Sequence, residues 1–499
     1  MRSENSTIAD GPGLADIQQH KKLMTVWSVT FLILFPLLIV LGLLMRANQG
    51  EVVKMEYSTF YSLMTLHGLG MAGTLFSIAY AALSYLIATR YVKLSVALGT
   101  TVYFLVVAGV VGLAGACLIG KFGAGWYLLY PLPFIGASWP QWSTGLATVS
   151  LLVLGAAWLV GSLHVVLALS KKYGGFSRLM GWAYLGRQEP ESELPPIALI
   201  ATVSLIPGIL AFLTAAAFLI LFLLQLFEPS LSFNALLLKN LLFFFGHTLV
   251  NITIYLAVGW VYVLFPEFSG REWKLNRVTV YGWNATFLFI LFAYFHHLYM
   301  DFAQPLSLQY IGQIASYMSA IPATAVTIFG IIAQVYHAEI RWTATPLAFT
   351  LGGMGWVIGG VAAVVDSTIA INKALHNTLW VPAHFHTYML AGVVLFILGF
   401  LYYLASPQES ARENTRAGAG FWLFVIGAYG FLAMFYLAGA NSIPRRFADY
   451  ATMGLASSHQ IGALLAQIAA AFVVLLLVGI LGVFWGLFVR LIARRTPPL

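Results

Sequence analysis

Twelve long apolar runs divide this sequence, and they constrain its fold more than any other feature. Each run has about 20 residues or more, enough for a helix to cross roughly 30 Å of hydrocarbon. Of the 499 residues, 60% are hydrophobic and only 8% are charged, so a water-soluble domain would lack a polar surface. The runs lie at about 23–46, 58–89, 94–120, 142–170, 196–227, 234–266, 276–299, 307–336, 345–370, 376–405, 419–440 and 461–489.

These runs predict an all-α integral membrane protein, a bundle of twelve transmembrane helices. We expect one domain over residues 1–499, with a polar tail at 1–22 and the bundle at 23–493. Most of the 25 Lys and Arg residues fall in segments that face the cytoplasm if the N-terminus is inside, which the positive-inside rule favours. The formal charge of +8 is therefore a topology signal and does not indicate nucleic-acid binding.

Several other classes of protein are excluded by what the sequence lacks. It has no GxxxxGK[ST] phosphate-binding motif, so ATP-driven transport is disfavoured. Its one cysteine, Cys117, rules out a disulfide framework and a cysteine-ligated cluster. The tail contains Asp10 and Asp16 and lacks the apolar core of a signal peptide, so we expect an ordinary polar tail and not a cleaved signal peptide.

Six histidines fall in the predicted membrane spans and share one slab of the membrane, five in the outer half and His247 near the middle. They are His67, His247, His296, His297, His384 and His386. A single histidine in such a helix could serve packing or a proton relay. Six imidazoles at one depth on four helices are costly to bury unless something coordinates them, and metal binding is the natural compensation.

The spacing of these histidines divides them into separate sites. Helical residues two apart point about 200° away from each other, so His384 and His386 cannot bind one metal. One of them needs a partner on another helix, for which His67 is the candidate, giving a six-coordinate haem. Adjacent His296 and His297 can converge with His247 on a third metal, and three imidazoles suit copper.

With these motifs the chain resembles subunit I of the haem-copper oxidase superfamily over essentially its whole length. The matching motifs are Phe245-Gly246-His247, His296-His297 and His384-Phe385-His386. The resemblance implies a bundle that encloses two haems and a third metal in a bacterial or archaeal cytoplasmic membrane, with both termini cytoplasmic. His67 and His386 would ligate a low-spin haem, of b type, and His384 a high-spin haem. His247, His296 and His297 would bind copper, with iron as the alternative.

Two further segments resemble the B-family of these oxidases. One runs from His376-Asn377 to His386, and the other is Pro444-Arg445-Arg446. By this resemblance Arg445 and Arg446 would pair with haem propionates, because guanidiniums on an outer loop need an anion. His376 and Asn377 would lie beside the same propionates, although both could equally be interfacial residues.

The resemblance breaks at the position one turn after the first copper ligand. Dioxygen-reducing members of the A- and B-families carry a tyrosine there, which supplies an electron and a proton for O–O cleavage. In this sequence the residue is Asn251. The C-family alternative is also missing, because its tyrosine position before the histidine pair is Ile290. Asn251 is therefore a candidate catalytic residue that donates a hydrogen bond to a bound substrate oxygen, or a structural link between helices.

The proton path that the B-family uses from the cytoplasm is altered as well. The hydroxyl positions on the eighth span are Ala323 and Val326, while Tyr262 retains one hydroxyl on the sixth. Thr324 and Thr327 leave a different route open. We therefore do not expect a working proton path of the B-family type.

Both departures favour nitric oxide as the substrate, because two NO molecules need only two electrons to give nitrous oxide and water. The leading hypothesis is the catalytic subunit of a nitric oxide reductase. The alternatives are a terminal dioxygen reductase with an altered proton path, and a non-catalytic transporter with relay histidines. The chain has no CxxCH motif and no cysteine pair, so we expect a partner subunit that brings electrons from cytochrome c, a dinuclear copper centre or quinol.

Overall fold

The computed structural model describes residues 13–186, 193–406, 418–454 and 456–493. Over these residues regular structure is almost entirely helical, and β-pairing is limited to an isolated bridge between Thr378 and Pro444. Twelve helical segments are long and apolar enough to cross a membrane. The prediction of an all-α multi-pass membrane protein is confirmed.

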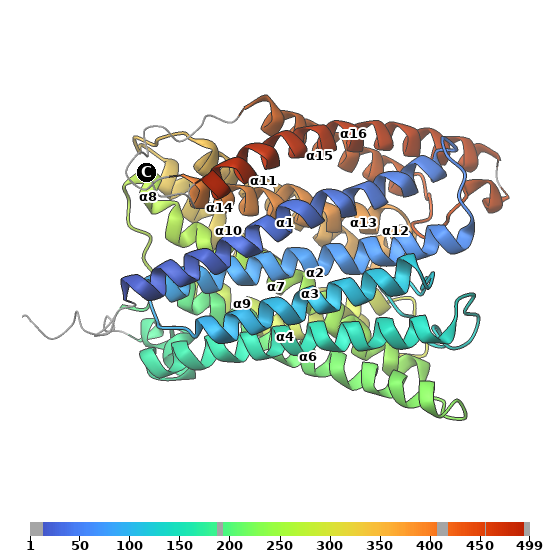
Figure 1. Ribbon diagram of the computed structural model, residues 1–499, viewed down its shortest axis with the longest axis horizontal. Helices are drawn as coiled ribbons and strands as arrows, with labels where there is room; N and C mark the ends of the chain where they lie inside the picture. Colours follow the sequence, from blue (N-terminus) through green and yellow to red (C-terminus); the bar gives the residue numbers. More distant parts are fainter. Residues whose placement is uncertain (1–12, 187–192, 407–417, 455, 494–499) are drawn as a thin grey trace, which may run out of the picture.

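The helices run along the long axis of the molecule, and the first and last helices begin and end at the same end of the bundle (Figure 1). The spans are α1 (Leu14–Gln49), α2 (Tyr57–Arg90), α3 (Val96–Leu118), α4 (Gln141–Tyr173), α6 (Pro196–Phe227), α7 (Ala235–Leu264), α9 (Arg277–Ala293) with η2 (Tyr294–Leu298), α10 (Ser307–Val335), α11 (Ala344–Ser367), α13 (Trp380–His386) with η3 (Thr387–Val393) and α14 (Val394–Ala405), α15 (Ala419–Ala440) and α16 (Ala456–Ala493). Short helices in the connections are α5 (Phe176–Leu179), η1 (Trp182–Leu185), α8 (Pro266–Ser269), α12 (Ile369–Leu375) and η5 (Tyr450–Met453).

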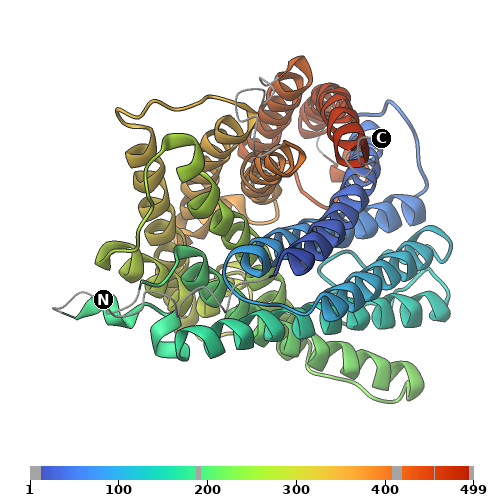
Figure 2. The same ribbon diagram turned by 60° about the vertical axis from the view of Figure 1, so that its left-hand side comes forward.

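Three spans form the centre of the bundle. In the most apolar stretch of each span, 94% of the residues are buried for Trp380–Ala405, 78% for α2 and 61% for the span beginning with α7, against 33% for α3. Figure 2 shows the other helices packed around this centre and not in flat layers. The central spans are the ones that carry His67, His247, His384 and His386.

Close helix contacts hold the bundle together where side chains are small. A Cβ atom added to Gly427 of α15 would lie 2.4 Å from the backbone nitrogen of Leu476 in α16. Within hydrocarbon, helices satisfy their own backbone hydrogen bonds, so their association depends on such packing.

The structure differs from the prediction at two spans. Helix α1 begins at Leu14, so residues 14–22 of the predicted polar tail are helical; His20 anchors them, with Nε2 3.1 Å from the carbonyl oxygen of Leu94. The span predicted at about 376–405 is present at Trp380–Ala405, but it starts later than predicted and is not a uniform α-helix. Asn377 has a left-handed φ of 62°, the helix starts only at Trp380, and η3 is a π-helix, a geometry that often occurs at functional sites.

Candidate metal centre

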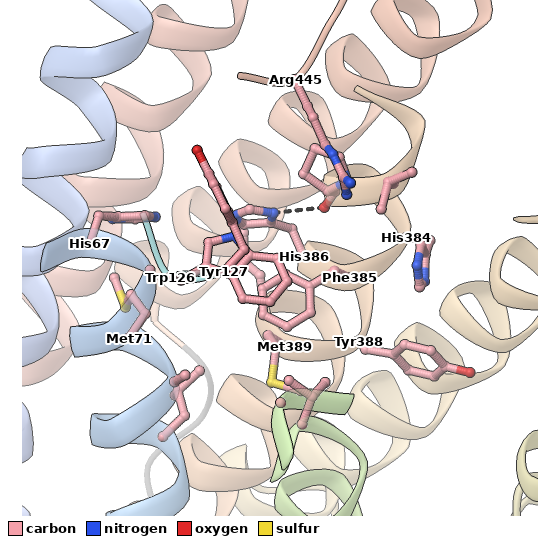
Figure 3. Close-up of a pocket in the computed structure, with 18 of the residues that line it drawn as sticks. His67, Met71, Trp126, Tyr127, His384, Phe385, His386, Tyr388, Met389 and Arg445 are labelled. Atoms are coloured by element: carbon pink, nitrogen blue, oxygen red, sulfur yellow. Dashed lines mark hydrogen bonds between the residues drawn. The ribbon is translucent and has the colours of Figure 1, made fainter. Parts of the chain in front are cut away.

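All six histidines line one cavity of about 330 Å³ in the interior of the bundle. They come from α2, α7, η2 and α13, four elements that are far apart in the sequence. Figure 3 shows His67 and His386 facing each other, with His384 on the other side of α13. The structure therefore brings together the residues that the sequence predicted as ligands and divides them into groups.

The first group is His67 and His386. Their rings are nearly parallel, at 17°, with centroids 6.4 Å apart. Nδ1 of His67 lies 2.8 Å from the carbonyl oxygen of Leu38, and Nδ1 of His386 lies 2.7 Å from that of Pro382. A backbone carbonyl accepts a hydrogen bond from Nδ1–H, so each Nε2 is left as a lone-pair donor for a metal.

The separation of these rings fits an iron between them. Imidazole forms metal–nitrogen bonds of about 2 Å. Two such bonds, together with the distance from each nitrogen to its ring centre, account for the separation of the two ring centroids. Gly42 of α1 makes room for this arrangement, because a Cβ atom there would lie 2.9 Å from Cε1 of His67. The residues present fit a haem with two histidine ligands.

The second group is His247, His296 and His297. Each offers a ring nitrogen, and these atoms lie within 4.8 Å of one another. His296 is oriented by Ser316, whose hydroxyl lies 2.9 Å from Nδ1. The histidine pair lies on η2, a 3-10 helix, and not on the α-helix that we predicted. Successive side chains are then about 120° apart, and both rings still reach His247, with centroids 5.0 and 5.4 Å away.

His384 lines the same cavity without belonging to either group. Its Nε2 lies 3.4 Å from Oδ2 of Asp366, a carboxylate that is 2% exposed. Among the described residues, neither Nδ1 of His384 nor Oδ1 of Asp366 has a hydrogen-bond partner. Buried polar atoms of this kind normally have partners, so an absent group completes this part of the cavity. A second haem with a single histidine ligand would bind the free ring nitrogen of His384, although it offers no donor to Oδ1 of Asp366.

Asn251 lies against the ligand group and not between two helices. Its Nδ2 donates to the backbone oxygen of His247 at 2.9 Å and lies 3.2 Å from Nε2 of the same histidine. These contacts stay within α7, and Asn251 also lines the cavity. The alternative prediction of a helix-to-helix hydrogen bond finds no support in the described residues.

Arg445 and Arg446 also line the cavity, where Figure 3 shows Arg445 above His386. Burial and the neighbouring Arg446 lower the pKa of Arg445, although a nearby carboxylate, Asp366, raises it. Arg445 Nε has no partner in the described part of the chain. A guanidinium stays charged in proteins, so this pair provides a site for an anionic group.

Asn377 positions Arg445. The backbone N–H of Arg445 donates to the Asn377 carbonyl at 2.9 Å, and its Nη2 donates to Asn377 Oδ1 at 3.0 Å. His376 lies beside this pair, and burial together with the charges of Arg445, Lys239 and Arg446 lowers the pKa of His376 to about 4. The imidazole of His376 is therefore neutral near pH 7.

The predicted alteration of the inner hydroxyl positions has a structural counterpart. Ala323 is fully buried, but the hydroxyl of Thr327 lies 3.0 Å from that of Tyr262. About two helical turns away, the Tyr255 hydroxyl donates to the Ser319 carbonyl. Hydroxyl groups thus lie along α7 and α10: Tyr262 matches the family pattern, and the other positions differ from it.

Sequence reasoning missed two charged residues of the cavity region. Asp366 and Arg46 each lie in an otherwise apolar span and are almost fully buried. That isolation was the available signal, because ionisable residues in membrane helices usually face a functional interior. Arg46 stacks on Phe435, 4.8 Å from the ring centroid, and Nη1 donates to Tyr450 at 3.4 Å.

Comparison with known proteins agrees with this architecture. The family model described as "Cytochrome C and Quinol oxidase polypeptide I" matches residues 22–474. The chain is 31% identical over 227 residues to "Cytochrome c oxidase polypeptide 1" of Halobacterium salinarum, covering 45% of this chain and 37% of that protein. It is 28% identical over 362 residues to "Cytochrome c oxidase subunit 1" of Cereibacter sphaeroides, covering 70% and 61%.

A solved structure of a heme-copper terminal oxidase dimer shares the fold, with a TM-score of 0.71 and 20% identity over 95% of this chain and 84% of that one. The aligned regions span less than two thirds of the first curated relatives. The family itself implies haems and copper, and the cavity provides imidazole ligands suited to both. The family model covers most of the sequence, so this chain belongs to the haem-copper oxidase subunit I family.

Proposed function

We propose that the chain is the catalytic subunit of a membrane-bound nitric oxide reductase. The observation that carries the proposal is Asn251, which lies against the copper-ligand candidate His247 where a dioxygen-reducing relative would need a phenol. Reduction of two NO molecules takes two electrons and two protons and releases nitrous oxide and water. An amide cannot give up an electron, so the centre must work with the electrons of its metals.

The ligand roles follow the grouping of the imidazoles. His67 and His386 would hold a low-spin haem, His384 a high-spin haem, and the three-histidine group a copper ion. When bound, the low-spin haem would supply electron transfer, and the high-spin haem and copper would supply the redox chemistry of substrate reduction. Three neutral imidazoles favour copper over iron at the third site.

The polar residues of the cavity would bind and orient. Asn251 has two N–H groups, one of which donates to the backbone oxygen of its own helix. The amide nitrogen also lies 3.2 Å from Nε2 of His247; with that imidazole bound to a metal, the second N–H would donate to a substrate oxygen as negative charge develops there. Arg445 and Arg446 would pair with propionates, and Asn377 would hold Arg445 in place. His376, neutral near pH 7, would be a neighbour of the same groups.

The setting of the enzyme is part of the same proposal. We expect a cytoplasmic membrane of a bacterium or archaeon with both termini inside, and an electron-donor subunit beside this chain. Protons for NO reduction could be taken up from the outside, since the family's inner hydroxyl positions are replaced at Ala323 and Val326.

A terminal dioxygen reductase is the second candidate, and the names of the relatives favour it over NO reduction. Those proteins are called cytochrome c oxidases, and Tyr262 with Thr327 supplies an inner hydroxyl pair. A tyrosine crosslinked to a ligand histidine would be required for the usual dioxygen chemistry, and peptide mass spectrometry would detect it.

Purified protein supplied with an artificial electron donor tests the proposal. We expect NO to be consumed with formation of nitrous oxide, and no crosslinked His247 peptide. Dioxygen uptake that exceeds NO consumption, together with a crosslinked peptide from elsewhere in the chain, would establish the second candidate instead.

A further inference from the structure

The three-histidine group is assembled from two elements that are distant in sequence, α7 and η2. One face of α7 contacts η2 and the residues that follow it. Lys239, Phe243 and His247 lie at intervals of four residues, and such residues share a helix face. Asn240 and Phe244, at the neighbouring positions, border this face.

Contacts on both sides of the histidine pair join η2 to this face. Before the pair, the Tyr294 hydroxyl donates to Asn240 Oδ1 at 3.3 Å. After the pair, Lys239 Nζ lies 2.7 Å from Asp301 Oδ1. Between them, the ring of Phe243 stacks on that of His297 at 28°, with centroids 5.3 Å apart.

The ion pair is the shorter of the two polar contacts. Its side chains are 26% and 23% exposed, so water screens the pair only in part. Asp301 lies in a turn just after η2, where its N–H donates to the Leu298 carbonyl and its own carbonyl accepts from Gln304. The backbone of Asp301 is therefore bonded to the end of η2, and the ion pair joins this end of η2 to α7.

A partly exposed ion pair adds little to global stability, typically about 0–1 kcal/mol. Its position matters more, because a 3-10 segment followed by irregular chain has few backbone restraints of its own. A metal site needs all of its ligands within bonding distance at once, and supporting contacts outside the ligand set commonly change metal affinity by about 10- to 100-fold.

We infer that Lys239 and Asp301 are positioning residues for the three-histidine metal site, clamping η2 against α7 so that His296 and His297 stay within reach of His247. The inference rests on the proposed role of these histidines as metal ligands. It does not depend on whether NO or dioxygen is the substrate.

The test measures copper in the purified full-length protein and not turnover. Asp301→Asn and Lys239→Met each remove the ion pair while retaining most of the side-chain volume. After dialysis against graded concentrations of a copper chelator, we expect the variants to lose copper at chelator concentrations at least tenfold lower than the wild type, with both haems retained. The charge-swapped double variant, Lys239→Asp with Asp301→Lys, should recover part of the difference.

Glu267→Gln is the matched control. Glu267 forms an ion pair with Arg90 of the same 2.7 Å length, with side chains 40% and 28% exposed, at the opposite end of α7. This variant should retain copper as the wild type does.

Three results would overturn the inference. Copper retention by Asp301→Asn and Lys239→Met equal to that of the wild type would show that the pair does not position the site. Equal losses in Glu267→Gln would show a general loss of stability, and joint loss of haem and copper would assign the pair to the fold. His297→Ala tests the ligand role separately, because that variant should lose copper whatever the ion pair does.

Discussion

Replacing Asn251 by leucine removes the amide of this position while keeping a side chain of similar size. In the wild type, Nδ2 is 2.9 Å from the His247 carbonyl oxygen and 3.2 Å from His247 Nε2. Leucine retains the contact with the cavity but cannot donate a hydrogen bond. We expect a large fall in the rate of NO reduction with copper and haem still bound.

The size of the effect decides between two roles of the amide. If Asn251 only orients His247, the loss is that of one neutral hydrogen bond, about 1 kcal/mol, or roughly fivefold. If its second N–H donates to a substrate oxygen that gains negative charge, the loss is that of a donor in the active site, about 10²- to 10³-fold in kcat. We predict the larger value, because the amide lines the cavity, the helix backbone takes only one of its N–H groups, and a metal on His247 would release the other.

The assay follows NO with an electrode and nitrous oxide by gas chromatography, with metal content measured on the same sample. Asn284→Leu is the control, since Asn284 also donates to the carbonyl four residues earlier, that of Val280, at 2.8 Å. A rate for Asn251→Leu within fivefold of the wild type, with copper retained, would refute the catalytic role of Asn251.

Three further predictions concern the haems and the proton route. His384→Ala should abolish the high-spin haem spectrum and leave the low-spin bands in place; loss of the low-spin bands instead would reverse the assignment. Gly42→Val should displace the ring of His67, at an overpacking cost of about 1–3 kcal/mol, and should broaden or shift the low-spin bands. Gly155→Val is the control and should leave these bands unchanged, because no atom lies within 4 Å of its added Cβ. Tyr262→Phe removes the hydroxyl paired with Thr327 and should leave NO turnover within about twofold, if protons come from outside; a tenfold loss would assign proton uptake to the inner route.

The sequence predicted the twelve spans and the grouping of the histidines, because both follow from local rules. Hydrocarbon thickness sets helix length, and helical periodicity alone separates His384 from His386. Spacing left open which of the two pairs with His67, and the choice of His386 came from the resemblance to the oxidase family; in the structure the rings of His67 and His386 lie nearly parallel in the cavity.

Features that depend on tertiary contacts were not predictable in the same way. The 3-10 geometry of η2 and the π-helical η3 arise from packing between spans, which periodicity does not encode. The Lys239–Asp301 pair joins residues on different elements, and no local pattern marks it. Asp366 could have been noticed as an isolated acid in an apolar span. Its pairing with His384 could not have been predicted, because the two residues lie on different elements.

Substrate preference of one reduced preparation tests the central proposal most directly. Fully reduced protein is supplied with a constant electron donor and given NO or dioxygen at equal concentration, and nitrous oxide formation and dioxygen uptake are recorded. We predict one nitrous oxide per two electrons and a higher rate with NO than with dioxygen. Faster dioxygen uptake, with little or no nitrous oxide from NO, would contradict the proposal and identify a terminal oxidase.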